Sequence, residues 1–383
     1  MKRTKIFLLL IIIAAIQSML TGCWNYKEID KLAIVAGVAI DKDTDGQYLV
    51  TAEIVQISGG KDSKTLSKPI SMKGKTVFDA VRNGVSLTGK RLYWSHSKVI
   101  ILSKDIASEG LKKILDWYIR DAESREDVNI LISNGESARE MFEGEGITED
   151  IKSFKLDETI KNQDSFSKAP LTDVLKYSIE IQTDGMSTVI PAINLKKSDK
   201  KMVPQIIGAA IIKDDKLAGF LNDEETKALN FIRNDIKGGI LVGITQENST
   251  PISLEIFYSK TTVTPVIDVT GIKFNLNIET TVAIGEIEGS ENVIEEEERK
   301  KLEQSTEKKL KEHIETLIKK VQSEYDADIF EFSSKLHEDK SNVWKKVSSN
   351  WEQIFKDLPV NVKTKVHIKN SAVLSKPLEE SDY

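Results

Sequence analysis

The feature that most constrains this chain is its N-terminal segment, which cannot belong to a globular core. Lys2, Arg3 and Lys5 precede an apolar run, Ile6–Ile16, and small residues follow at positions 21 and 22. This order of basic, apolar and small residues is typical of a secretory signal peptide. The run has about 11 residues, whereas a helix needs roughly 20 to span the core of a bilayer. We therefore predict that residues 1–22 are a removed leader and that the body begins at Cys23.

Cys23 is the single cysteine of the chain, and it stands directly after the predicted cleavage point. The stretch Leu20, Thr21, Gly22, Cys23 resembles the lipobox of bacterial lipoproteins. That resemblance implies an N-palmitoyl and S-diacylglycerol cysteine at position 23. One acyl chain anchors a protein only marginally, whereas two or three hold it stably on a membrane. The expected location is therefore a membrane, with the body lipid-anchored on the extracytoplasmic face. The alternative is a plain hydrophobic helix with an accidental cysteine.

The composition describes a folded, acidic body of several domains. The chain has 383 residues, of which 40% are hydrophobic and 30% charged, as in globular proteins. Its net charge of −6 becomes −9 once the three basic residues of the leader are removed. Such a balance argues against nucleic acid as a partner, because phosphate contacts need clustered basic residues. A single cysteine excludes an intrachain disulfide and a thiolate metal site, and no metal or cofactor is expected.

Hydrophobic periodicity predicts an α+β fold of several domains, with mixed and antiparallel sheets that are each packed with helices. In the first part, strands are expected at 32–40, 48–57, 99–102, 128–132 and 188–192, and helices at 75–87, 106–120 and 171–181. In the second, strands are expected at 205–212, 217–221, 240–245, 253–259, 261–269, 272–284 and 360–368, and helices at 223–233, 295–324 and 343–355. A polar linker at 196–201 predicts a boundary near residue 200. The predicted domains are 23–200, 201–260 and 261–383.

Two stretches match part of a ligand-binding loop motif but lack one of its essential residues. Residues 41–46 start like a calcium loop, but Ala52 stands where the bidentate glutamate belongs and strands flank the stretch. A hairpin turn accounts for it better. Residues 84–91 approach a phosphate-binding loop, but Arg91 replaces the Ser or Thr that holds magnesium, and a helix precedes it instead of a strand.

Several residues near the new N-terminus resemble one known family. Cys23-Trp24, Glu28-Ile29, Leu32, Val35, Gly37 and Asp41 are similar to the start of the spore germinant-receptor C-subunit lipoproteins, the GerAC-like or Ger(x)C family. Matches continue at Tyr93, His96, Asp116, Arg120 and Arg125, in the hairpin at 208–219, and at Trp344, Trp351 and 359–362. The resemblance covers nearly the whole chain after residue 22.

This resemblance implies a function in spore germination. Such a protein is a lipid-anchored subunit in the spore inner membrane of a sporulating Gram-positive bacterium. It acts with membrane-embedded A and B subunits in a receptor for nutrient germinants, and it is not an enzyme. The chain accordingly has no nucleophile elbow and no His-Glu-x-x-His metal motif.

The candidate partner-binding residues are Trp24, Asp116, Arg120 and Arg125. Trp24 lies beside the anchor, and the other three cluster around a turn that follows a predicted helix. Asp116 and Arg120 are four residues apart, which permits an ion pair on one helix face. This cluster can also be a structural network that makes no contact with a partner.

Two other functions compete with the receptor subunit. A solute-binding lipoprotein that feeds a transporter would hold its ligand in a cleft between two α/β lobes, with repeated strand–helix units. The strict alternation of 272–284 and 360–368 argues against that arrangement, because it is typical of sheets with one wet face. A surface hydrolase is the third reading, and no catalytic motif in the chain favours it.

Overall fold

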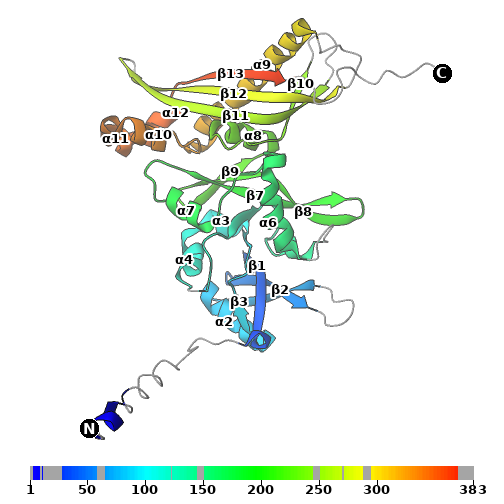
Figure 1. The fold of residues 1–383 in the computed structure, drawn as a ribbon, viewed down its shortest axis with the longest axis vertical. Helices are drawn as coiled ribbons and strands as arrows, with labels where there is room; N and C mark the ends of the chain where they lie inside the picture. The colour runs from blue at the N-terminus through cyan, green and yellow to red at the C-terminus, as the bar shows by residue number, and fades with distance from the viewer. Residues whose placement is uncertain are drawn as a thin grey trace, which may run out of the picture.

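The computed structural model describes residues 3–8, 11, 28–57, 65–121, 123–144, 151–244, 251–269, 271–287 and 295–369. Two β-sheets follow one another along the long axis of the molecule (Figure 1). The first sheet occupies the lower half, nearest the N-terminus, and the second occupies the upper half. Among the described helices, none combines the length and the apolar character that a bilayer span requires.

The first sheet has nine strands in the order β3-β2-β1-β5-β6-β7-β8-β9, with β4 paired to β1. Its central strands β1, β5, β6 and β7 run parallel, and antiparallel hairpins flank them on both sides. The strands are β1 Leu32–Lys42, β2 Tyr48–Ile57, β3 Thr65–Gly74, β4 Arg91–Tyr93, β5 Val99–Leu102, β6 Asn129–Ser133, β7 Thr188–Ser198, β8 Lys201–Lys213 and β9 Lys216–Leu221. The short apolar runs of β5 and β6 form the middle of the sheet, where both faces are covered.

Helices cover both faces of this sheet. Alternate residues of β1 point to opposite sides, so Val38 and Ile40 join one core while Ala39 joins another. The first core includes residues of α2, α3, α4 and α7, and the second includes residues of α5 and α6. These helices are α2 Val77–Thr88, α3 Lys104–Glu109, α4 Lys112–Arg120, α5 Glu140–Glu143, α6 Lys152–Lys161 and α7 Val174–Glu180.

The predicted helix at 106–120 is two helices, because the backbone breaks at Gly110. Gly110 has a φ of 130°, which a side chain would strain. The N–H groups of Leu111 and Lys112, at the start of α4, both donate to the Asp215 carboxylate, at 3.0 and 2.7 Å. That carboxylate lies in the turn between β8 and β9. A side chain about a hundred residues away therefore supplies the cap that divides the helix.

Periodicity predicts that Val77, Phe78, Val81 and Val85 share the apolar face of α2 and that Ile119 belongs to the inner face of α4, and both predictions are partly wrong. On α2, Val77 and Val81 are buried as expected, but Phe78 is 46% exposed and Val85 is 41% exposed. On α4, Ile119 is 44% exposed. Small residues of α2, Ala80 and Gly84, face the sheet instead. Close approach of the backbone to the sheet thus rotates the larger side chains outward.

The second sheet has the order β10-β11-β12-β13. Its first three strands are antiparallel, and β13 lies parallel to β12 at the edge. The strands are β10 Ile240–Ile244, β11 Pro251–Asp268, β12 Gly271–Ile287 and β13 Val360–Lys369. The helices are α8 Asp223–Ile232, α9 Glu296–Lys320, α10 Phe332–Asp339, α11 Ser341–Val347 and α12 Trp351–Lys356. The two strands predicted at 253–269 are one strand, β11, whose register shifts between Ile256 and Tyr258.

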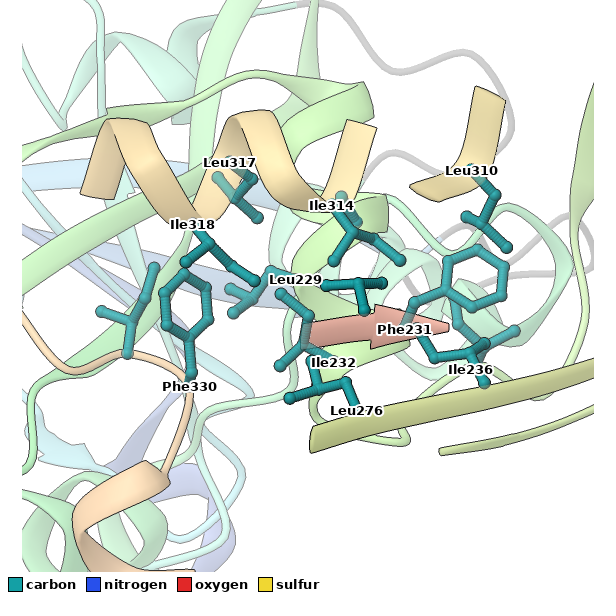
Figure 2. Packing of buried hydrophobic residues seen from close by; sticks show 14 of the residues in the cluster. Leu229, Phe231, Ile232, Ile236, Leu276, Leu310, Ile314, Leu317, Ile318 and Phe330 are labelled. Atoms are coloured by element: carbon teal, nitrogen blue, oxygen red, sulfur yellow. The ribbon is translucent and has the colours of Figure 1, made fainter. Parts of the chain in front are cut away.

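The core of the upper half is formed where α9 lies over α8 and β12 (Figure 2). Leu310, Ile314, Leu317 and Ile318 project from α9 towards Leu229 and Ile232 of α8, Leu276 of β12 and Phe330. Periodicity predicts an apolar stripe on this helix at positions 302, 310, 314, 317, 318 and 321, and that stripe is its buried face. At the start of α8, the Asn222 side chain accepts the N–H of Glu225, and the Glu225 carboxylate accepts the N–H of Asn222. This reciprocal pair is a capping box.

The predicted α+β class, with mixed and antiparallel sheets packed by helices, is confirmed. Residue 200 lies in the tight turn between β7 and β8, which are hydrogen-bonded neighbours. The first sheet therefore continues across that position. Of the predicted part 201–260, β8 and β9 belong to the first sheet and β10 belongs to the second. The division into 23–200, 201–260 and 261–383 remains a prediction about folding units.

Candidate partner-binding surface

Three of the predicted partner-binding residues lie on α4 and on the loop that follows it. Asp116 and Arg120 are on α4, and Arg125 is on the loop 121–127, which leads into β6. We call α4 residues 116–120 together with this loop the charged surface. The predicted lipobox, Leu20, Thr21, Gly22 and Cys23, and the neighbouring Trp24 lie outside the described residues.

Each arginine of the charged surface is paired with a nearby aspartate. Arg120 donates from Nε to the Asp116 carboxylate at 2.7 Å, which confirms the predicted pair on one helix face. Arg125 donates from two nitrogens to both oxygens of Asp127, at 2.7 and 2.6 Å. All four side chains are more than half exposed. Such pairs add little stability but present fixed donors and acceptors to solvent.

Contacts from β4 and the turn after it hold the loop in place. Arg91, at the start of β4, pairs with the Glu123 carboxylate at 2.9 Å. The Ser95 hydroxyl donates to the Glu123 carbonyl oxygen at 2.8 Å, and the Glu123 N–H donates to the Asp121 carboxylate at 2.9 Å. The contacts from Arg91 and Ser95 each cross about thirty residues of sequence, so the charged surface has a defined shape.

An aromatic cluster lies beneath the charged surface. Trp117 meets the rings of Trp94 and Tyr118 edge to face, with centroids 5.4 and 5.7 Å apart. Trp94 and Tyr118 are each 2% exposed. Burial raises the pKa of Tyr118 to about 12, so its hydroxyl stays protonated at physiological pH. The cluster supports α4 rigidly, which fixes the position of Asp116 and Arg120.

The arginines also control the charge of this surface. Hydrogen bonding from Arg120 lowers the pKa of Asp116, and hydrogen bonding from Arg125 lowers that of Asp127. Both aspartates are therefore ionised throughout the physiological range. The result is a surface of alternating fixed charges, which suits recognition of a complementary protein surface rather than acid–base chemistry.

Sequence reasoning missed Arg91 and Asp127 as members of this surface. Asp127 stands two residues after Arg125, so its proximity could have been used. Arg91 pairs with Glu123 across 32 positions, and no local spacing signals that contact.

His96 is an exposed residue whose ring meets Tyr93 edge to face at 5.9 Å.

The two imitations of ligand-binding loops have structural roles. Residues 41–46 end β1 and enter its hairpin turn to β2, as predicted, and the Asp43 carboxylate in that turn accepts the N–H groups of Asp45 and Gln47. Gly89 has a φ of 64° and ends α2, so residues 84–91 are a helix end and not a phosphate cradle. Within the described part of the chain, no three His, Cys, Asp or Glu side chains are grouped for a metal ion.

A pocket of about 400 Å³ lies in the upper half, between α8, β10 and α9. Phe231, Leu241 and Leu310 form its apolar wall, and Lys227 and Lys309 line its polar side. Both lysines donate to carbonyl oxygens of β10, at 3.2 and 3.1 Å. The pocket belongs to the helical face of the second sheet.

This chain is similar to known proteins over almost its whole length. Residues 25–195 match the family profile of the spore germination protein N-terminal domain. Residues 207–372 match the profile described as spore germination B3/GerAC like, C-terminal.

Individual relatives match at nearly full length. Spore germination protein B3 of Bacillus subtilis (strain 168) is 29% identical over 347 residues, covering 88% of this chain and 91% of that protein. Spore germination protein KC of the same strain is 21% identical, covering 94% of this chain and 95% of that protein. The crystal structure of the GerBC protein is similar with a TM-score of 0.58 at 26% identity, covering 87% of this chain and 97% of that one.

Both halves of the fold are thus accounted for by one family. The N-terminal profile ends at residue 195, within β7, and the C-terminal profile begins at 207, within β8. The chain belongs to the GerAC-like, Ger(x)C family of spore germination proteins.

Proposed function

We propose that this protein is the lipid-anchored C subunit of a nutrient germinant receptor, and that it assembles with membrane-embedded A and B subunits. The observation that carries the proposal is the match of both family domains over residues 25–195 and 207–372. The relatives named spore germination proteins B3 and KC support the same role. The anchor itself rests on the sequence, where Cys23 ends a lipobox.

In this proposal the protein acts by binding and not by catalysis. Lipid attached to Cys23 would restrict the body to the outer face of the spore inner membrane. Restriction to that surface raises its effective concentration near membrane-embedded partners. The charged surface around Asp116, Arg120 and Arg125, together with Trp24, is the proposed contact with those partners.

The test combines a deletion with a purification. Removing the gene should abolish or slow germination in at least one nutrient condition. Tagged protein purified from detergent-solubilised spore membranes should bring down one A and one B subunit. Unchanged germination in every nutrient tested, together with no A or B subunit recovered, would contradict the proposal. Tight binding of an amino acid or sugar by the purified chain, measured by calorimetry, would favour the solute-binding alternative instead.

A further inference from the structure

The lower end of the molecule has a tip made of two segments that are distant in sequence. These are the short helix η1, Ile29–Lys31, and the end of α2 with the start of β4, residues 87–91. They lie side by side because Leu32 of β1 pairs with Arg91 of β4. Figure 1 shows this end of β1 and α2 at the bottom of the molecule, away from the second sheet.

The tip exposes two large apolar side chains. Ile29 is 75% exposed and Leu87 is 63% exposed. Behind them, Ala33 is 5% exposed and Leu92 is 3% exposed, and Leu32 is half-buried. The sheet therefore begins directly behind the tip, and the two side chains in front of it have no core to join. Large apolar side chains exposed at one end of a body suit contact with another apolar phase.

Basic residues stand beside the apolar pair. Lys31, Lys90 and Arg91 carry long side chains whose charged ends can remain in water while their stems cover apolar surface. Lys31 pairs with Glu28, and Arg91 pairs with Glu123. Asp30 adds a further negative charge, so basic and acidic groups are balanced. A balanced, polar rim around two apolar side chains fits the headgroup region of a bilayer without demanding anionic lipid.

The length of the preceding chain places this tip close to the predicted anchor. Glu28 follows Cys23 by five residues, which span at most about 18 Å when extended. Trp24 and Tyr26 lie in that interval, and such aromatic residues favour the membrane–water interface. The headgroup region on each side of a bilayer is itself roughly 5–8 Å thick. The tip is thus the part of the described body nearest the bilayer.

We propose that Ile29 and Leu87 insert into the headgroup region of the bilayer and give the body a second contact with the membrane. This inference rests on the proposed lipid anchor at Cys23. A body with an anchor alone can rotate about its tether, whereas two contacts restrict its orientation. The Arg91–Glu123 pair then connects the tip to the charged surface, which is held near the membrane where partner loops emerge.

The experiment asks whether these side chains touch lipid in the full-length, membrane-bound protein. A photoreactive benzoyl-phenylalanine replaces Ile29, Leu87 or, as a control, Val269. Val269 is fully exposed and lies in the turn between β11 and β12, in the upper half. All three positions are solvent-exposed, so circular dichroism should report an unchanged fold. After illumination of the membranes, mass spectrometry measures covalent adducts with lipid.

Lipid adducts should be severalfold more abundant at positions 29 and 87 than at 269. In the doubly substituted chain Ile29→Glu, Leu87→Glu, a probe at position 90 should give fewer adducts than in the parent. Protein that is in the membrane fraction without adducts at 29 and 87 would overturn this inference and leave the anchor standing. Protein that is absent from the membrane fraction would overturn both.

Discussion

Arg125 and Arg233 have the same side chain in opposite environments. Arg125 is 59% exposed and pairs with Asp127 in solvent. The side chain of Arg233 is 1% exposed, and its guanidinium lies 3.6 Å from Glu180 and 3.4 Å from Glu331. Exposed ion pairs add at most about 1 kcal/mol, whereas breaking a buried pair leaves an uncompensated charge. Loss of the Arg125 pair should therefore affect the fold little, so this side chain is available to bind a partner. Arg233, in contrast, is needed for the stability of the fold.

Substituting Arg125→Glu should weaken assembly while leaving the fold intact. The change replaces a fixed positive charge by a negative one beside Asp127 at an exposed position, so the urea midpoint of unfolding should stay close to that of the parent chain. Co-purification of the A and B subunits should fall markedly. Lys346→Glu on α11 makes the same charge change at an exposed position of the upper half and should leave co-purification unchanged. Equal recovery of partners from both variants would remove Arg125 from the proposed surface.

Arg233→Met should cost about 3 kcal/mol of stability, because the buried Glu180 carboxylate loses its guanidinium and keeps only Lys176, at 3.7 Å, and the Thr188 hydroxyl. The carbonyl oxygen of Ile329 loses its donor in the same variant. Urea denaturation of the purified chain measures the loss. Arg139→Met, which breaks the exposed pair with Glu143, is the matched control and should cost less than about 1 kcal/mol. Similar losses in the two variants would show that burial of the Arg233 pair is not what matters.

The charges of Asp116 and Asp127 should be constant through the physiological range. The pKa of each is lowered below 3.8 by hydrogen bonding from its arginine. A folded-state pKa below the unfolded value means that the pair's contribution is present above about pH 4 and is lost as pH falls through the folded pKa. Carboxyl carbon NMR should place both midpoints below 3.8. In Arg120→Gln the Asp116 midpoint should rise towards that value, and a midpoint unaffected by the substitution would contradict the assignment.

At the scale of elements, single carboxylates hold helices and strand edges in place. The buried Glu53 of β2 accepts the N–H groups of Lys152 and Ser153 at the start of α6, each at 2.9 Å. On α9, Glu307 and Glu303 accept the N–H groups of Val366 and Ile368 on the edge strand β13, at 3.0 and 2.8 Å. Glu303 and Glu307 thus bind edge N–H groups of β13 that could otherwise pair with a strand of another chain.

Glu53→Gln should destabilise the docking of α6 on the first sheet. The amide retains one acceptor oxygen but turns an NH₂ group towards backbone donors, leaving a buried N–H without its partner. Loss of such a bond costs about 1–3 kcal/mol. Hydrogen–deuterium exchange should become faster at 152–161, while exchange at β12 should be unchanged. Ser67→Ala removes only a hydroxyl donor to the same carboxylate and should have a smaller effect. Unaltered exchange at 152–161 in Glu53→Gln would contradict this role.

At the scale of the whole molecule, one of the hydrophobic cores includes residues of both halves. Val189, Ile211 and Leu221 of the first sheet belong to the same buried cluster as α8, α9 and the second sheet. Asp328 reinforces the joint from the upper half, where its buried carboxylate accepts the indole N–H of Trp351 at 3.0 Å and the N–H of Ser333 at 2.7 Å. Its own carbonyl oxygen accepts the N–H of Ser187, just before β7. The body is therefore expected to move as one unit on its anchor.

Cys23→Ala should release the protein from the membrane fraction without detergent. The two apolar side chains of the tip are too few to replace acyl chains, since even one acyl chain binds only marginally. Fractionation followed by immunoblotting measures the distribution. Trp24→Ala keeps Cys23, the proposed site of lipid attachment, and should remain membrane-bound. Retention of the Cys23→Ala protein in the membrane fraction would contradict the proposed anchor.

The sequence by itself determined the local character of most elements, and it carried the motif at Cys23. Strands such as β1 and β12 and the buried stripe of α9 follow from side-chain periodicity, which is a local property of the chain. The Asp116–Arg120 pair could be predicted for the same reason, since its members are one helical turn apart. The family resemblance, read from residues near Cys23, agrees with both family profiles.

Only the tertiary structure decided the features that depend on long-range contacts. Asp215 divides the helix predicted at 106–120, β7 and β8 continue the first sheet across residue 200, and Arg91 completes the charged surface through Glu123. The contacts of Asp215 and Arg91 join residues that are far apart in sequence, so no local pattern predicts them. The turn between β7 and β8 has the polar composition of a linker, so its sequence does not show that the two strands pair. The exposed tip has the same origin, because the pairing of β1 with β4 brings Ile29 and Leu87 to the same end of the first sheet.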